Sequence, residues 1–131
     1  MYKRQRYTKA HDLLAPGEIV THVEIPARKG AAHYDKFRER RTIDFAVVGL
    51  GSCYELDGGE VKSASIVLGA VAPVPVRCTE AENYLLGRTL TEAAAEEAAE
   101  LALAGAEPLA QNAWKVQIAK TLIKRSLLRL L

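Results

Sequence analysis

The tetrapeptide at 57–60, Asp-Gly-Gly-Glu, restricts the possible folds of this chain more than any other stretch, because it separates two long apolar runs. An Asp-Gly pair in that setting predicts a β-hairpin, since the central residues of a type I′ turn need positive φ angles. The preceding run, 42–56, then forms one strand and the following run, 61–72, forms the returning strand. Pro73 and Pro75 are expected to end the returning strand, because proline has no N–H to donate to a sheet.

The run at 42–56 is apolar at both alternations of a strand. This pattern predicts a central strand that is covered on both faces, and a helical segment is the alternative. Gly49 and Gly51 argue against the helix, because glycine weakens a helix interior. In a strand, the same two glycines indicate close packing against another element.

Two more strands are expected before this hairpin. Residues 13–27 predict a Pro-Gly turn and then a strand that Pro26 ends. Four alternate residues of this strand share one face: Ile19, Thr21, Val23 and Ile25. His22 falls on the opposite face, where a solvent-side position is favoured over catalysis because no acidic partner is placed to orient its ring. After a change in composition at 28–30, which marks a candidate domain boundary, a second strand is expected over 32–38.

The following residues carry helix start and stop signals. Thr79 and Glu82 form a capping-box pattern for a short helix that stops at Gly87. Thr91 is expected to cap a second, alanine-rich helix that ends near Gly105.

A third helix is expected from Asn112, as its cap after a break at Pro108, to Leu131. Six residues form its apolar stripe: Trp114, Val116, Ile118, Leu122, Ile123 and Leu127. Cations crowd its C-terminal half, where they favour the helix dipole, so a solvated basic end is expected rather than a phosphate or RNA site. These cations are Lys120, Lys124, Arg125 and Arg129.

Together these elements predict an α+β fold, in which an antiparallel β-sheet of three to four strands is followed by a cluster of three α-helices. The chain has 131 residues, of which 49% are hydrophobic and 26% charged, and this is sufficient for one globular domain with a core. Cys53 and Cys78 have no Cys or His at ligand spacing, so two reduced, buried thiols are expected rather than a disulfide or metal site. No apolar run could span a bilayer or act as a signal peptide, so a cytoplasmic location is expected.

Residues 1–5, Met-Tyr-Lys-Arg-Gln, match the translation of a sequencing adapter and are interpreted as adapter-derived. Without Lys3 and Arg4 the formal net charge falls from +2 to zero, so the charge indicates no nucleic-acid partner. On this interpretation the native protein extends upstream.

The stretch 34–48, YDKFRERRTIDFAVV, joins a dense cluster of charges to an apolar segment, with Asp44 at the boundary. Charged side chains held where a turn meets a buried strand can face a ligand. From composition alone, a solvated turn with internal ion pairs is favoured over an anion site. The sequence contains no glycine-rich phosphate loop, HExxH, paired cysteines or GxSxG motif, so no catalytic or metal-ligating residue is assigned.

Four segments resemble a known family in their order and spacing: LAPGEIVTHVEIP, KFRERRTIDFAVV, VLGAVAPVPVRCTEAENYLLG and AEPLAQNAWKVQIAKTLIKRSLLRLL. Together they resemble the C-terminal domain of the FAD-binding (medium) subunit of molybdenum hydroxylases, the family of carbon monoxide and xanthine dehydrogenases. The resemblance covers nearly the whole chain after Gln5. It implies that 6–27 are the tail of an upstream FAD-binding domain and that 28–131 form a CO dehydrogenase flavoprotein C-terminal-like domain.

The resemblance also implies a role in electron transfer. In such enzymes a molybdopterin-binding subunit oxidises the substrate, 2Fe-2S clusters in an iron–sulfur subunit carry the electrons, and FAD passes them to an acceptor such as NAD. The loops that hold the flavin phosphates belong to the upstream domain, so the isolated chain is expected to be inactive. The alternative is a stand-alone module that docks onto protein partners without a cofactor.

By position, the resemblance assigns four cofactor-binding candidates. Val20 matches an aliphatic residue that packs near the flavin, and Lys36 matches a lysine whose ammonium reaches the isoalloxazine, where a cation would favour the reduced anionic ring. Arg40 and Asp44 lie in a turn that corresponds to a loop bordering the acceptor side of the flavin. The structural alternatives are a core position for Val20, a surface charge for Lys36 and a strand-start cap for Asp44. The recurring APVPVR segment, with Arg77, is expected to be structural, because two prolines make a strand-to-helix joint rigid. Arg77 could equally face an iron–sulfur subunit, and an exposed salt bridge is the alternative.

Overall fold

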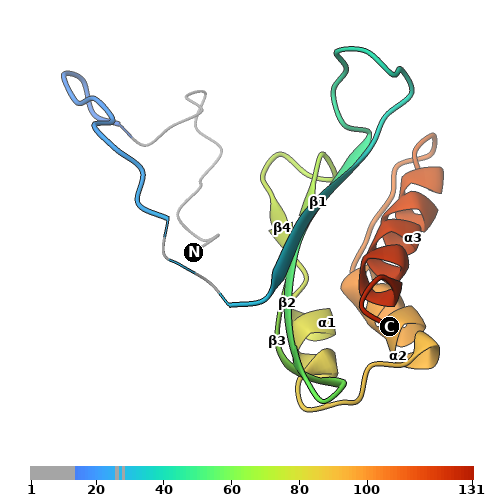
Figure 1. Cartoon of the computed structure of the whole chain (residues 1–131). Coiled ribbons are helices and arrows are strands. Elements are labelled where there is room, and N and C mark those ends of the chain that lie inside the picture. Colours follow the sequence, from blue (N-terminus) through green and yellow to red (C-terminus); the bar gives the residue numbers. More distant parts are fainter. Residues whose placement is uncertain (1–13, 26, 28) are drawn as a thin grey trace.

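The computed structural model describes residues 14–25, 27 and 29–131. This part of the chain contains a four-stranded sheet and three helices (Figure 1). The strands are β1 (Ala31–Phe37), β2 (Val48–Asp57), β3 (Glu60–Gly69) and β4 (Val76–Arg77). The helices are α1 (Thr79–Leu85), α2 (Glu92–Ala102) and α3 (Trp114–Leu128). Each strand pairs antiparallel with the next, in the order β1-β2-β3-β4, so the α+β prediction is confirmed.

The β2–β3 hairpin is the element that the sequence predicts most directly. Residues 57–60 form its turn, and Gly58 and Gly59 have φ angles of 57° and 84°, as a type I′ turn requires. β3 is shorter than expected, because it ends at Gly69 and Ala70 follows with a φ of 61°. The chain therefore leaves the sheet before it reaches the two prolines.

All three helices lie on one side of the sheet (Figure 1). α1 and α3 contact the strands, and α2 packs on these two helices. On β2, the side chains of Val48, Leu50 and Tyr54 are at most 1% exposed. They share one apolar core with Ile66 and Leu68 of β3. The helices contribute Leu85, Ala95, Ala98, Ile123 and Leu127 to the same core. Removing this apolar surface from water is the main stabilising contribution to the fold.

The prediction that the 42–56 strand is covered on both faces is wrong. Residues 42–47 lie in a loop, and the second face of β2 carries Gly49, Gly51 and Cys53. These residues make both alternations apolar in the sequence, but Gly51 and Cys53 are only half-buried. In the part of the chain that the structure describes, no helix packs on that side (Figure 1). We call the side of β1, β2 and β3 that faces away from the helices the open face.

The strand expected after the Pro-Gly turn does not form in residues 14–25. The turn itself is present, with Gly17 at a φ of 91°. The residues that follow pair with none of the described strands, and Ile19, Val23 and Ile25 are 77–85% exposed. A segment with alternating polarity forms a strand only where a neighbouring strand satisfies its backbone hydrogen bonds.

Several predictions concern residues outside those that the structure describes. Residues 1–5, which are interpreted from the sequence as adapter-derived, the polar stretch 6–13, Pro26 and Arg28 lie outside the described residues. The strand expected over 32–38 is described, and it is confirmed as β1.

The predicted helix ends are confirmed at two positions and wrong at a third. The Oγ1 atom of Thr91 accepts a hydrogen bond from Ala94 N at 3.1 Å, so Thr91 caps α2 as expected. Gly87 follows α1 with a φ of 72°, the conformation that ends many helices. Asn112, however, does not cap α3, because the residue before the helix is Ala113 and no side chain accepts from the first turn.

The capping box predicted from Thr79 and Glu82 is also wrong. Cys78 precedes α1 and makes no side-chain hydrogen bond to the helix. The Glu82 carboxylate instead accepts hydrogen bonds from Ile66 N of β3 at 2.8 Å and from Arg77 Nε at 2.9–3.0 Å. Glu82 therefore joins α1 to the sheet, and Arg77 forms the partly exposed salt bridge that was the alternative for it.

Three of the four cations toward the C-terminal end of α3 pair with acids on neighbouring elements, and all four remain partly or fully exposed, so the basic end is solvated as expected but also ion-paired. The pairs are Lys120–Glu100 (2.5 Å), Lys124–Glu92 (3.2 Å), Lys124–Glu96 (3.5 Å) and Arg129–Asp35 (2.5 Å). The buried side of α3 consists of Ala119, Ile123, Ser126 and Leu127. Trp114, which was expected in the apolar stripe, is 50% exposed.

Both cysteines are free thiols, as expected, but only Cys78 is buried. Burial, together with the negative charge of Glu82, raises the pKa of Cys78 to about 11. Cys53 is half-buried on the open face.

Candidate functional site

Lys36 lies on the open face, near the end of β1. The pairing of β1 with β2 places Lys36 opposite Gly49 and Tyr34 opposite Gly51. The residue between them, Asp35, points to the helix side and pairs with Arg129, which directly follows α3. Because alternate residues of a strand point to opposite sides, Lys36 and Tyr34 share the side that the helices leave uncovered.

Glycines leave part of the open face without side chains. Gly49 pairs with Gly69, and Gly51 pairs with Val67. A Cβ atom at Gly51 or Gly69 would have a carbonyl oxygen at 3.9 Å as its nearest neighbour across the sheet, so the backbone there is accessible from above. Gly49 differs, because the hydroxyl oxygen of Tyr34 lies 2.9 Å from the place of a Cβ atom and the ring covers this glycine.

The charged loop at 38–47 begins and ends beside Lys36. A hydrogen bond from Val47 N to Phe37 O, 2.9 Å long, closes its base. The ammonium of Lys36 donates a hydrogen bond to the main-chain oxygen of Asp44. The lysine therefore connects the end of β1 to the far side of the loop.

Asp44 is held within this loop by Arg40. The backbone N of Arg40 donates to Asp44 Oδ2, and Nη2 of Arg40 donates to Oδ1, each at 3.1 Å. The side-chain hydrogen bond from Arg40 is the main cause that lowers the pKa of Asp44 from its ordinary value, and the backbone hydrogen bond adds to it. The internal ion pair expected of a solvated turn is thus present. Asp44 does not cap a strand, because β2 begins only at Val48.

The structure brings together three of the four predicted cofactor-binding residues: Lys36, Arg40 and Asp44. The fourth, Val20, is 65% exposed and lies in the segment 14–25, which extends away from the sheet (Figure 1). The structural alternative of a core position for Val20 is therefore wrong in the described part of the chain.

Sequence reasoning missed the contribution of Tyr34 and Gly69 to this surface. Their positions depend on which residues face each other across strands, and no local signal carries that information. It also missed the exposure of Ile43 and Phe45, which are 98% and 93% exposed in the charged loop. A signal was available for these two, because large apolar residues within a cluster of charges often belong to a contact surface.

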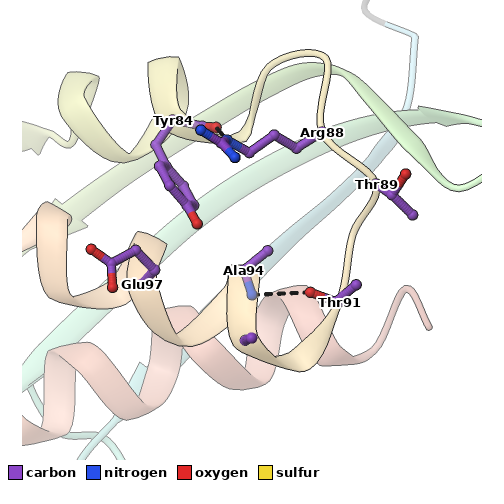
Figure 2. A pocket seen from close by; sticks show the side chains of 7 residues that line it. Tyr84, Arg88, Thr89, Thr91, Ala94 and Glu97 are labelled. Carbon is purple, nitrogen blue, oxygen red and sulfur yellow. Dashed lines mark hydrogen bonds between the residues drawn. The ribbon is translucent and has the colours of Figure 1, made fainter.

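A surface hollow of about 680 Å³, separate from the open face, lies between the end of α1 and the start of α2 (Figure 2). The guanidinium of Arg88 lies over the ring of Tyr84, 4.3 Å from its centroid, and Nε of Arg88 donates to Tyr84 O at 2.7 Å. The hydroxyl of Thr91 is engaged as the cap of α2. These polar groups stabilise the fold itself, so this hollow is a weaker candidate than the open face.

Two further properties concern the described residues alone. Within 14–25, 27 and 29–131, no group of three or more His, Cys, Asp or Glu side chains is placed to hold a metal ion. None of the helices in this part of the chain is long and apolar enough to cross a membrane.

Known proteins are similar to this chain in sequence and in fold. The alpha subunit of the 6-hydroxypseudooxynicotine dehydrogenase complex of Paenarthrobacter nicotinovorans is 30% identical over 125 residues, which are 90% of this chain and 42% of the relative. The aldehyde oxidoreductase FAD-binding subunit PaoB of Escherichia coli K12 is 32% identical over 108 residues, 82% of this chain and 31% of the relative.

A solved structure is also similar. It is the carbon monoxide dehydrogenase of Hydrogenophaga pseudoflava, in a form that lacks the Mo-pyranopterin moiety of its molybdenum cofactor. The match has a TM-score of 0.66 and 34% sequence identity and covers 73% of this chain and 34% of that chain. The chain thus spans less than half the length of these proteins. Residues 32–130 match the family model described as the CO dehydrogenase flavoprotein C-terminal domain, and the chain belongs to this family.

Proposed function

We propose that this chain is the C-terminal part of the FAD-binding subunit of a molybdenum hydroxylase-type oxidoreductase. In that enzyme it forms one wall of the flavin site and part of a subunit interface. The family supports a flavoprotein context, and the similar proteins include an FAD-binding subunit and an enzyme with a molybdenum cofactor. Bound FAD supplies electron transfer from the 2Fe-2S clusters of an iron–sulfur subunit to an acceptor such as NAD. A molybdopterin-binding subunit oxidises the substrate.

The observation that carries this proposal is the open face beside Lys36. The backbone at Gly51 and Gly69 has no side chain above it, so a planar ring can approach closely. Tyr34 provides an aromatic edge to this bare area, and Lys36 provides a cation next to it. A flat surface with one cation at its border suits a ring system that gains negative charge on reduction.

The role proposed for Lys36 is electrostatic. An ammonium has three N–H donors, and the main-chain oxygen of Asp44 takes one of them, which leaves donors for a ligand. A fixed cation beside the ring stabilises negative charge on it and makes reduction more favourable. The hydrogen bond to Asp44 also limits where the flexible lysine side chain can lie.

Arg40 and Asp44 are proposed to border the acceptor side of the flavin. Their ion pair gives the loop a defined shape at the place where an acceptor would approach. Val20 is proposed to pack near the flavin once the remaining part of the subunit covers it, since an aliphatic side chain that is 65% exposed gains by burial. The exposed Ile43 and Phe45 are proposed to be buried against other parts of the enzyme for the same reason.

The test uses the complete subunit with FAD bound and the substitution Lys36→Ala. A hydrogen bond to a charged group is worth roughly 1.5–3 kcal/mol, which corresponds to a midpoint potential lower by about 30–60 mV for a two-electron couple. An anaerobic redox titration followed by flavin absorbance measures this potential. In the assembled enzyme, transfer to the acceptor should slow, while substrate oxidation at molybdenum should not change.

Lys62→Ala is the matched control, because Lys62 is an exposed lysine in the β2–β3 hairpin and pairs only locally with Glu60. The control should leave the potential unchanged. Equal potentials for the two variants would remove Lys36 from the flavin site. A second measurement concerns the isolated chain, which should bind FAD weakly; binding at submicromolar concentration would contradict the view that the phosphate-binding loops lie elsewhere.

A further inference from the structure

A cavity of about 370 Å³ lies on the helix side of the sheet, away from Lys36. It is bounded by the residues that follow β3, by the connection between α2 and α3, and by the first turns of α3. Its walls are mainly aliphatic and include Val71, Val76, Leu103, Pro108 and Val116. This volume and lining are typical of sites that hold a small organic ligand.

One polar group in this lining has no hydrogen-bond partner. Asn112 lines the cavity, and its Oδ1 atom is buried without a donor among the described residues. This is the side chain that the sequence suggests as the cap of α3, but it does not serve as one. A buried amide oxygen without a donor is unfavourable, so it gains from a ligand that brings one.

The one cation among these lining residues, Lys115, donates to a main-chain oxygen. Nζ of Lys115 donates to the main-chain oxygen of Ala70 at 2.7 Å. Ala70 has a φ of 61°, which is unusual for a residue with a side chain, and it begins the turn that carries Val71 into the cavity wall. The ammonium therefore stabilises this turn, and among the described residues it makes no hydrogen bond to Asn112 Oδ1, so a ligand can supply the missing donor.

We propose that this cavity binds a small, neutral, largely apolar ligand with one N–H or O–H group, which donates to Asn112 Oδ1. The aliphatic walls favour an apolar body. The two charged residues of the lining, Glu107 and Lys115, have opposite signs, so the lining as a whole favours neither an anion nor a cation. Rotation of the amide about χ2, a broad torsion, allows the oxygen to turn toward the donor. The cavity lies on the opposite side of the sheet from the proposed flavin wall, so the two proposals are independent.

Three bicyclic probes of nearly equal shape test the proposal. Indole carries one N–H donor, indene carries no polar group, and benzofuran carries an oxygen acceptor in place of the donor. Each is titrated into the ¹⁵N-labelled chain, and binding is followed by NMR shifts of Val71, Ala72, Ala106 and Val116. Ligands of this size bind at about millimolar concentration.

Indole is expected to bind about fivefold more tightly than indene, which corresponds to one net neutral hydrogen bond. Asn112→Leu should abolish this preference and leave the binding of indene intact. Ala106→Trp, which places a large side chain at an exposed position of the lining, should weaken all three probes. Saturable shifts in none of the probes would overturn the proposal. A preference for benzofuran over indole would also overturn it, because the amide would then present its NH₂ group.

Discussion

Glu82 connects α1 to the sheet, and its removal should destabilise the protein far more than removal of a neighbouring glutamate. Glu82 is 5% exposed, and its carboxylate accepts from Ile66 N at 2.8 Å inside the fold. Glu82→Ala leaves this N–H without its charged acceptor, which costs about 1.5–3 kcal/mol. The Arg77 side chain is 47% exposed, so loss of this screened ion pair adds at most about 1 kcal/mol. The expected decrease in the free energy of unfolding is therefore about 1.5–4 kcal/mol.

Urea unfolding followed by circular dichroism measures this decrease. With a typical urea dependence of about 2 kcal/mol per molar for a domain of this size, the midpoint should fall by roughly 1–2 M. Glu82→Gln keeps an oxygen that can accept from Ile66 N and should lie between the wild type and Glu82→Ala. Glu80→Ala is the control, because Glu80 is exposed in the same turn of α1, and its effect should stay below about 1 kcal/mol. Equal midpoints for Glu82→Ala and Glu80→Ala would refute the reasoning.

Three further predictions concern groups inside the fold. Burial raises the pKa of Tyr54 from 10.0 to about 12, so the stabilising contribution of the neutral phenol is complete below pH 10 and is lost as the pH rises toward 12. In that interval the free energy of unfolding of the wild type should fall relative to that of Tyr54→Phe by up to about 1.4 kcal/mol per pH unit. Parallel plots of unfolding free energy against pH for the two proteins would contradict this. At pH 8 iodoacetamide should label the half-buried Cys53 well before Cys78, whose pKa is raised to about 11, whereas both should react alike in urea. Gly30→Ala should destabilise the protein by about 2 kcal/mol or more in thermal unfolding. Gly30 has a φ of 108°, and a Cβ atom there would lie 2.3 Å from the carbonyl oxygen of Tyr54. Gly105→Ala is the control and should be nearly neutral, because its Cβ atom would meet no atom within 4 Å.

The candidate site was predictable only in part. Lys36, Arg40 and Asp44 lie within ten residues of one another, so their proximity follows from a short chain segment that must turn between two strands. The bare backbone at Gly51 and Gly69 was not predictable, because these glycines come together only through the register of β2 and β3. A shift of register by one residue would turn either strand over and bring different side chains to the open face.

The same distinction explains the errors at Glu82 and Asn112. Each residue type favours a helix start, and each stands at the right distance from one. In the folded chain Glu82 accepts from the backbone of β3, and Asn112 lines a cavity between elements. A local preference of about 1 kcal/mol is easily exceeded by contacts that form only when the elements pack.

The sequence alone determined the elements whose stability is local. The turn at 57–60 needs glycines with positive φ, and α2 combines a threonine cap with a run of alanines, so both formed where the pattern predicted. Tertiary structure decided which of the remaining segments became part of the fold and what each surface offers. Among the residues that the structure describes, the segment 14–25 has the alternation of a strand but no partner strand, and β2 has two apolar faces but helices on only one of them. The physical reason is that backbone hydrogen bonds and burial depend on neighbours distant in sequence, which a local pattern does not specify.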